Sequence, residues 1–293
     1  MSIEGIAAEA AQTADDRRIH RRWGASMVIG ACLVGLVVLA ALASFVWTPH
    51  PATHVDAAHK LVAMFDGDYP LGTDKFGRDT ASQLMVGART TLFVGIVAVG
   101  IAGFIGVPLG ILAGMTGRWL GESVMRMNDL VLAFPALLLA IMMSAVFGAG
   151  TLTAMVAIGV ATIPAFARIA RGQTIQVMQT EYVLAARSAG RRGVAIAYRH
   201  VLPNIASVLL VQASVSFAIA ILAEAALSFL GFGTRPPTPS WGRMLHEGQE
   251  LLFSAPRLAL LPGAAIALAV LGFNLLGDGL RDFLDPKLRG HRQ

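Results

Sequence analysis

The chain has 293 residues, of which 55% are hydrophobic and only 14% are charged. Its mean hydropathy of +0.65 and its long apolar runs exclude a soluble globular protein and predict a membrane protein with several spans. The net charge of +5 does not indicate nucleic-acid binding, because the basic residues gather at the ends of apolar segments, where membrane topology explains them.

Six apolar runs are long enough to cross a membrane as helices. A hydrocarbon core of about 30 Å requires about 20 helical residues, and only internally hydrogen-bonded helices or closed barrels can cross it. Because the runs are rich in Ala, Leu and Gly, we expect an all-α protein with six transmembrane helices. These helices are predicted at residues 25–47, 90–114, 124–147, 151–170, 204–228 and 257–277.

The first run, residues 25–47, has two interpretations. Preceding arginines and the small residues Ala41-Leu42-Ala43 are also typical of a cleaved secretory signal. We favour an uncleaved span, because the run continues to Trp47 and is long enough to cross a bilayer. The run contains Cys32, and as the single cysteine it excludes an intrachain disulfide and a cysteine-based metal site.

Residues 48–89 are expected to form a long extracytoplasmic loop. Within the segment PLGTDKFGRD, residues 70–79, glycines and aspartates favour turns, because glycine adopts positive φ and aspartate bonds nearby backbone. The candidate residues of this loop are Gly72, Asp74, Gly77, Arg78 and Asp79. Three histidines in the same loop lack acidic or thiol partners at ligand spacing, so we expect a solvated loop without a metal. They are His50, His54 and His59.

Glycines and prolines inside the spans predict how the helices pack. Gly106, Gly110 and Gly114 are four residues apart, so one face of the second span lacks side chains and allows another helix to approach closely. Prolines remove a backbone hydrogen bond and favour kinks within a span. They stand at positions Pro108, Pro135, Pro164 and Pro262.

Two acidic residues lie within expected spans, where a charge is costly and requires a reason. Asp129 is near the cytoplasmic end of the third span, and we expect it to pair with Arg126 or Arg168. Glu224 is near the outer end of the fifth span, where it either forms an interhelical hydrogen bond or ion pair or lines a pathway. Both residues are therefore candidates for a translocation path as well as for structural roles.

Lysine and arginine are distributed unequally between the two sides that six spans define. One side carries sixteen of them and the other seven, and the richer side is cytoplasmic by the positive-inside rule. This rule assigns the two tails, residues 1–24 and 281–293, and the connection at 168–203 to the cytoplasm. The seven basic residues on the opposite side are Lys60, Lys75, Arg78, Arg89, Arg235, Arg243 and Arg257.

The cytoplasmic connection contains the segments EYVLAARSAG, residues 181–190, and RRGVAIAYRHVLPN, residues 191–204. The first predicts a helix with small residues on one side, which Gly190 ends. The second predicts a short helix that runs to Pro203, with an apolar side formed by Val194, Ile196, Ala197 and Val201. An ordinary basic loop would explain the arginines but not the spacing of glutamate, paired alanines and glycine.

This pattern resembles the EAA loop of permease subunits in binding-protein-dependent ABC importers. Three further segments resemble the second permease of the dipeptide and oligopeptide systems. The four motifs occur in order, and the resemblance covers nearly all of the chain from the first span to Leu288. The segments are YPLGTDKFGRD at 69–79, PPTPSWGRML at 236–245 and NLLGDGLRDFLDPKL at 274–288.

The resemblance implies a type I ABC importer permease fold in a bacterial inner membrane. It implies a core permease domain of five spans at 90–280, with a coupling loop at 171–203. The residues that would couple to the ATPase are Glu181, Tyr182, Ala185, Ala186, Arg187, Gly190, Ile196, Arg199 and Pro203. The implied partners are a second homologous permease, two cytoplasmic ATPase subunits that use ATP and Mg²⁺, and an extracytoplasmic substrate-binding protein.

The chain itself is expected to bind no cofactor and to lack an ATPase site. A phosphate-binding loop requires a Gly-Lys pair, whereas Lys60, Lys75 and Lys287 follow His, Asp and Pro. Within the resembled family, peptide, glutathione and nickel importers remain alternatives. An intramembrane enzyme would need a converging acid, base or metal cluster, and a membrane scaffold would lack nucleotide-dependent uptake.

Overall fold

The computed structural model describes residues 24–284, and in this range the chain forms helices and no β-strand. The basic residues of the two tails, at positions 17–22 and 287–292, lie outside the described range. The helices are α2 (Ala25–Val46), α3 (Thr80–Met115), α4 (Arg118–Leu132), α5 (Ala136–Phe147), α6 (Thr151–Met178), α7 (Glu181–Ser188), α8 (Gly193–Ile196), α9 (Leu202–Phe229), α10 (Trp241–Gln249) and α11 (Arg257–Leu284).

Five helical segments of the described chain are each long and apolar enough to cross a membrane. The expected third span at 124–147 is not one straight helix, because α4 and α5 meet at a bend of 79°. The bend lies at Pro135, which has no N–H to donate and disfavours helical backbone at the preceding residue. Six spans result if the bent pair counts as one. The other spans are α2, α3, α6, the continuous run Gly193–Phe229, and α11.

The expected loop at 48–89 was wrong at its C-terminal end, because α3 already begins at Thr80. Asp79 is the N-cap of α3, and its side chain accepts hydrogen bonds from the backbone N–H groups of Ala81 and Ser82. An aspartate in this position satisfies N–H groups that have no partner within the helix. The structured loop therefore covers residues 47–79.

Two other boundaries also differ from those expected. Helix α6 continues to Met178, so the predicted coupling loop at 171–203 begins only after that residue. Helix α11 continues to Leu284, so residues 281–284 of the expected C-terminal tail are helical. In both cases the helix extends beyond the apolar run, because hydrophobicity marks the part within lipid and not the end of the helix.

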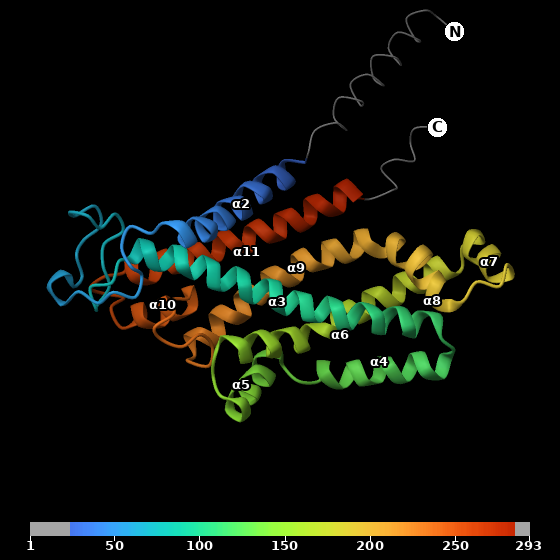
Figure 1. Cartoon of the computed structure of the whole chain (residues 1–293). Helices are drawn as coiled ribbons and strands as arrows, with labels where there is room; N and C mark the ends of the chain where they lie inside the picture. The colour runs from blue at the N-terminus through green and yellow to red at the C-terminus, as the bar shows by residue number, and fades with distance from the viewer. Residues whose placement is uncertain (1–23, 285–293) are drawn as a thin grey trace, which may run out of the picture.

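Helices α3 and α6 pack closely along the predicted glycine face (Figure 1). A Cβ atom added at Gly106 would lie 2.6 Å from the carbonyl oxygen of Ile163. One added at Gly110 would lie 2.3 Å from the carbonyl oxygen of Ala167. The missing side chains therefore allow the backbones to approach, as the sequence predicts.

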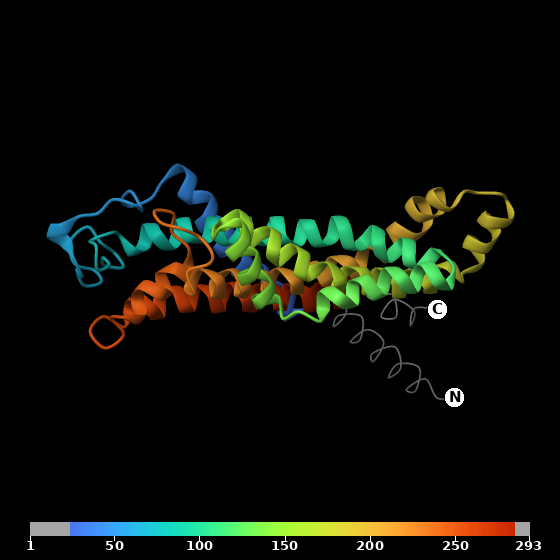
Figure 2. The ribbon, with the colours of Figure 1, turned by 90° about the horizontal axis from the view of Figure 1, so that it is seen from below.

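The long helices form an elongated bundle with different structures at its two ends (Figures 1 and 2). Helices α7 and α8 form one end, and the 47–79 loop and α10 form the other. Helix α2 packs on α11, and α11 packs on α9. In Figure 1, the first residues of α2 and the last residues of α11 point toward the end that carries α7.

Candidate functional site

The end of the bundle formed by α7 and α8, residues 181–201, is anchored in the bundle by buried apolar side chains. Val183 of α7 and Ile196 of α8 are almost fully buried. They pack in one cluster with Ile111 of α3 and Ala170 of α6. We call this end the α7–α8 tip. Because closely packed side chains transmit strain, we expect a movement of the tip to move α3 and α6 as well.

The turn after α7 has the geometry that Gly190 predicts. The N–H of Gly190 donates to the carbonyl of Arg187 at 2.9 Å, and the N–H of Arg191 donates to the carbonyl of Ala186 at 3.1 Å. These two bonds form a Schellman motif, whose central residue has positive φ. The φ of Gly190 is +75°. This turn directs the chain from α7 back toward the membrane.

The second short helix differs from the expectation. It does not end before the next span, because α8 continues through a π-helical turn, Ala197–Val201, into α9. The π turn precedes Pro203, which has no N–H to donate to the carbonyl of Arg199. The expected apolar side was wrong for Val194, which is 71% exposed, because it points away from the buried Ile196 two residues later.

Apolar and charged side chains are both exposed on the tip. The half-exposed Leu184 lies on α7, and Tyr198, which is 72% exposed, follows α8. The rings of Tyr182 and His200 lie 5.9 Å apart and join the two arms of the tip. Leu184 and Tyr198 were missed in the sequence, although Val194 and Tyr198 are spaced four apart, as on one helical face.

The charged residues of the tip form no ion pair with any residue in the described range. Glu181 is in the first turn of α7, where a negative charge is favourable near the positive helix end. Its charge and those of the arginines thus remain available to another molecule. The exposed arginines are Arg187, Arg191, Arg192 and Arg199.

Replacing Gly190 by alanine should loosen α7. A Cβ at this position meets no atom within 4 Å, so the effect isolates the strain of positive φ. That strain is roughly 1–2 kcal/mol, which corresponds to a roughly 5- to 30-fold change in a local opening equilibrium. Hydrogen exchange of the α7 amides measures this change. Gly172→Ala, in α6 and equally free of contacts, should leave exchange in α7 unchanged; equal exchange in both variants would contradict the turn geometry.

Asp129 and Arg168 form the expected ion pair between α4 and α6. The distance between the Arg168 Nη2 and the Asp129 Oδ1 is 2.6 Å, and both side chains are more than half exposed. Exposed pairs of this kind contribute about 0–1 kcal/mol. The pair explains why Asp129 is tolerated in a span, and a pathway role stays a prediction.

Glu224 is buried near the C-terminal end of α9, the end remote from the tip, and is 1% exposed. Its Oε1 accepts a hydrogen bond from the Ser228 hydroxyl at 2.7 Å and lies 3.5 Å from the hydroxyl of Thr234. Its Oε2 has no hydrogen-bond partner among the described residues. In this conformation Glu224 joins α9 to the loop that follows it and does not face an open cavity.

The structure brings the candidate residues of the 47–79 loop together. Much of the loop is exposed as expected, including His54 and His59, but most residues of its 72–79 segment are buried. Asp74 is buried, and its carboxylate accepts bonds from the backbone N–H groups of Phe76 at 2.8 Å and Arg78 at 2.9 Å. It also accepts from the Arg78 Nε at 2.6 Å and from the Gln83 Nε2 at 3.0 Å. Gly72 and Gly77 adopt positive φ and pack against loop backbone. The segment is a folded unit because Asp74 organises its interior.

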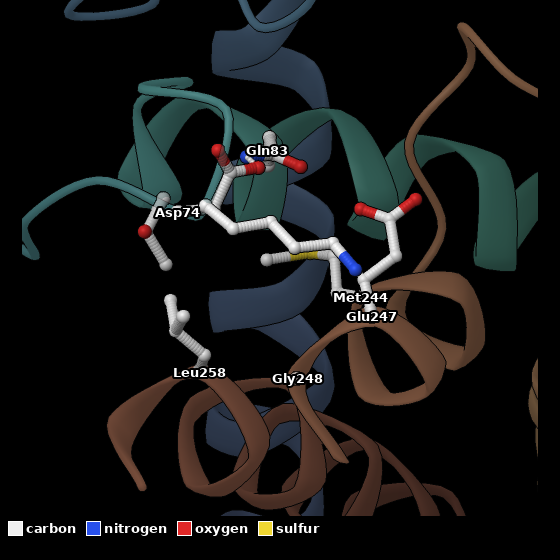
Figure 3. Close-up of a pocket in the computed structure, with 8 residues that line it drawn as sticks. Asp74, Gln83, Met244, Glu247, Gly248 and Leu258 are labelled. Atoms are coloured by element: carbon white, nitrogen blue, oxygen red, sulfur yellow. Dashed lines mark hydrogen bonds between the residues drawn. The ribbon is translucent and has the colours of Figure 1, made fainter. Parts of the chain in front are cut away.

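Ion pairs attach this loop to α10. Arg78 pairs with Glu247, which also accepts from the Arg243 Nε at 2.8 Å. Figure 3 shows Asp74, Gln83 and Glu247 around a cavity of about 20 Å³, room for roughly one water molecule. Lys75 pairs with Glu250, and its hydrogen bond and then its charge lower the pKa of that carboxyl group. These links connect the 47–79 loop and α10 into one surface at the end of the bundle opposite the tip.

Comparisons with known proteins agree on the kind of protein that this chain resembles. A model of the family "binding-protein-dependent transport system inner membrane component" matches residues 106–290. The dipeptide transport system permease protein of Alkalihalophilus pseudofirmus is 38% identical over 89% of this chain and 86% of its own length. The glutathione transport system permease protein of Pectobacterium atrosepticum is 41% identical over 88% of this chain and 87% of its own length.

A third relative and a solved structure extend the comparison. The di/tripeptide transport system permease protein of Pseudomonas aeruginosa is 44% identical over 75% of this chain and 72% of its own length. A chain of the inward-facing MetNI methionine ABC transporter has the same fold, with a TM-score of 0.59 and 19% identity. It is matched over 69% of this chain and 97% of its own length.

Proposed function

Because the chain belongs to the family of inner membrane components of binding-protein-dependent transport systems, we propose that it is a permease subunit of an ABC importer for dipeptides or other short peptides. The observation that carries this proposal is the α7–α8 tip. It is fixed to α3 and α6 by buried side chains, yet it exposes apolar and unpaired charged residues to another molecule. A surface of this composition is suited to a protein partner.

The partner of the tip is a cytoplasmic ATPase subunit. A cleft on that subunit closes around the small residues of α7, and Glu181 and the arginines orient it. Ile196 supports the tip from inside, and Gly190 and Pro203 set the directions in which the chain enters and leaves it. The residues exposed toward the ATPase are Glu181, Tyr182, Ala185, Arg187 and Arg199, with Ala186 partly covered.

Nucleotide chemistry belongs to two ATPase subunits and not to this chain, since no lysine of the sequence follows a glycine. ATP and Mg²⁺ are used there. A second, related permease completes the pathway, and an extracytoplasmic binding protein delivers the substrate. Ion pairs connect α10 and the 47–79 loop into one surface at the end opposite the tip. This surface is suited to contact the binding protein.

The transport mechanism is alternating access. ATP binding closes the ATPase dimer, and the tip moves with it as a rigid lever because Val183 and Ile196 attach it to the spans. Helices α3 and α6 move together because of their close glycine contacts, and each contains an internal proline, Pro108 or Pro164. Hydrolysis then resets the assembly.

The names of the relatives favour peptide import over the alternatives. Two of those described above carry dipeptide or di/tripeptide transport in their names, and a third carries glutathione, itself a small peptide. Glutathione import is thus the second candidate, with the same architecture. A nickel importer has no support among these relatives.

The orientation is tested by labelling single cysteines from outside intact cells. In a Cys32→Ser background, Asp68→Cys in the exposed part of the outer loop should react with an impermeant thiol reagent. Ser188→Cys on the α7–α8 tip should react only after the cells are opened. Labelling of position 188 from outside, with position 68 protected, would reverse the orientation and remove the tip from the ATPase.

A further inference from the structure

An apolar groove of about 710 Å³ opens between α2 and α3. Its floor includes Phe217 of α9 and Phe273 of α11, whose rings stack with centroids 4.2 Å apart. Among the described residues that line it, Arg89 of α3 is the only polar one apart from three threonines. Neither the coupling of the tip nor the outer surface uses this groove.

Arg89 marks one end of the groove and places it in the membrane. Its guanidinium carbon lies 4.4 Å from the centroid of the Phe45 ring, in the last turn of α2. Trp47, which is exposed, follows at the end of that helix. Aromatic side chains at a helix end mark the headgroup level, so the Arg89 guanidinium lies at this level and the groove continues into the hydrocarbon.

The length of the groove matches one leaflet. Its α2 wall runs from Phe45 through Leu42 and Val38 to Val34. From residue 34 to residue 45 there are eleven helical steps of about 1.5 Å, which give about 16 Å. This length is close to half of a hydrocarbon core of about 30 Å.

The charge of Arg89 has no counterpart in the described part of the chain. Arg89 forms no ion pair or hydrogen bond with a described residue. Its guanidinium makes a cation–π contact with the Phe45 ring. At the headgroup level this charge is satisfied by water or by an anionic group of a lipid. A phosphodiester provides a complementary charge with oxygens that match the guanidinium fork.

We propose that this groove binds one phospholipid of the outer leaflet, with its phosphate on Arg89 and one acyl chain along α2 from Phe45 to Val34. A peptide substrate fits less well, because the described lining is apolar apart from Arg89 and three threonine hydroxyls, which are too few partners for the amide groups of a buried peptide. The leaflet follows from the orientation in the proposed function. The groove and its ligand do not depend on what the assembly transports.

The proposal is tested in the assembled complex in lipid nanodiscs. The probe is phosphatidylglycerol with a diazirine in the middle of one acyl chain. We expect photolabelling of peptides that contain residues 34–45 and 89–96. Arg89→Gln should reduce this labelling by about tenfold, because a charge-assisted bond is lost. Arg89→Lys should keep most of it, because a cation remains. Arg235→Gln, which removes an exposed arginine from the outer side, is the matched control and should not change it.

A second measurement identifies the occupant directly. Phe93 lines the groove and is half exposed, so p-benzoylphenylalanine at this position should capture a phospholipid upon illumination. Capture of a neighbouring protein subunit in place of lipid would show that the groove is a subunit interface and overturn the proposal. Labelling at background level, or equal labelling of the wild type and Arg89→Gln, would overturn it as well. Each of these outcomes is independent of the transport activity.

Discussion

Replacing Ala185 by tryptophan is expected to weaken binding of the ATPase subunits by about 5- to 150-fold and so to reduce their copurification. Ala185 is exposed on α7, where its small side chain leaves room for a partner to close around the helix. Forcing a large side chain into a packed contact costs about 1–3 kcal/mol, and each 1.4 kcal/mol is about tenfold in affinity. The measurement is the amount of ATPase retained per mole of this chain after affinity purification.

The control for this variant is the same substitution at the other end of the molecule. Ala57→Trp changes an exposed alanine in the 47–79 loop and should leave ATPase retention unchanged. Both variants should reach the membrane in wild-type amounts, because neither side chain is part of a span. Wild-type ATPase retention by Ala185→Trp would show that α7 does not enter a cleft on the ATPase.

Replacing Gly110 by leucine should destabilise the bundle by about 1–3 kcal/mol or more. A Cβ at this position would meet the carbonyl oxygen of Ala167 at 2.3 Å, so α3 and α6 must move apart. Backbone atoms cannot move aside as easily as the end of a flexible side chain. Thermal unfolding of the detergent-solubilised chain, followed by size-exclusion chromatography, measures the loss.

Gly100 provides the matched control on the same helix. A Cβ there meets no atom within 4 Å, so Gly100→Leu should unfold at the wild-type temperature or slightly above it. Equal destabilisation by both substitutions would show that the contact between α3 and α6 does not determine the effect.

Local features of the fold could be predicted because their causes lie within a few residues. The turn that follows α7 has a residue with positive φ, which glycine adopts without strain, so Gly190 could be recognised as the end of the helix. The four-residue spacing of the glycines in α3 likewise defines a helix face that another backbone can approach. The same reasoning located the apolar spans. It did not establish the bend at Pro135, because a proline in a span leads to a mild kink or a full break depending on how its neighbours pack.

Boundaries and distant pairs could not be predicted so well. The start of α3 at Thr80 depends on Asp79, which has the chemistry of a helix cap but was interpreted as a turn residue. Besides the nearby Asp74, Arg78 pairs with Glu247, which is 169 residues away and which only the fold brings close to it. The apolar side chain of Val194 is exposed, because Ile196 and Val201 already occupy the buried face of this segment.

ATP-driven uptake in vesicles tests the proposed function most directly. This chain would be reconstituted with its second permease, the two ATPase subunits and the binding protein, with ATP on the side of the α7–α8 tip. We predict that a labelled dipeptide accumulates and that its accumulation requires ATP and this chain. Unlabelled dipeptide should inhibit the uptake more than glutathione does, and Ala185→Trp should abolish it. Dipeptide uptake of equal rate in vesicles that lack this chain, or uptake unaffected by Ala185→Trp, would contradict it.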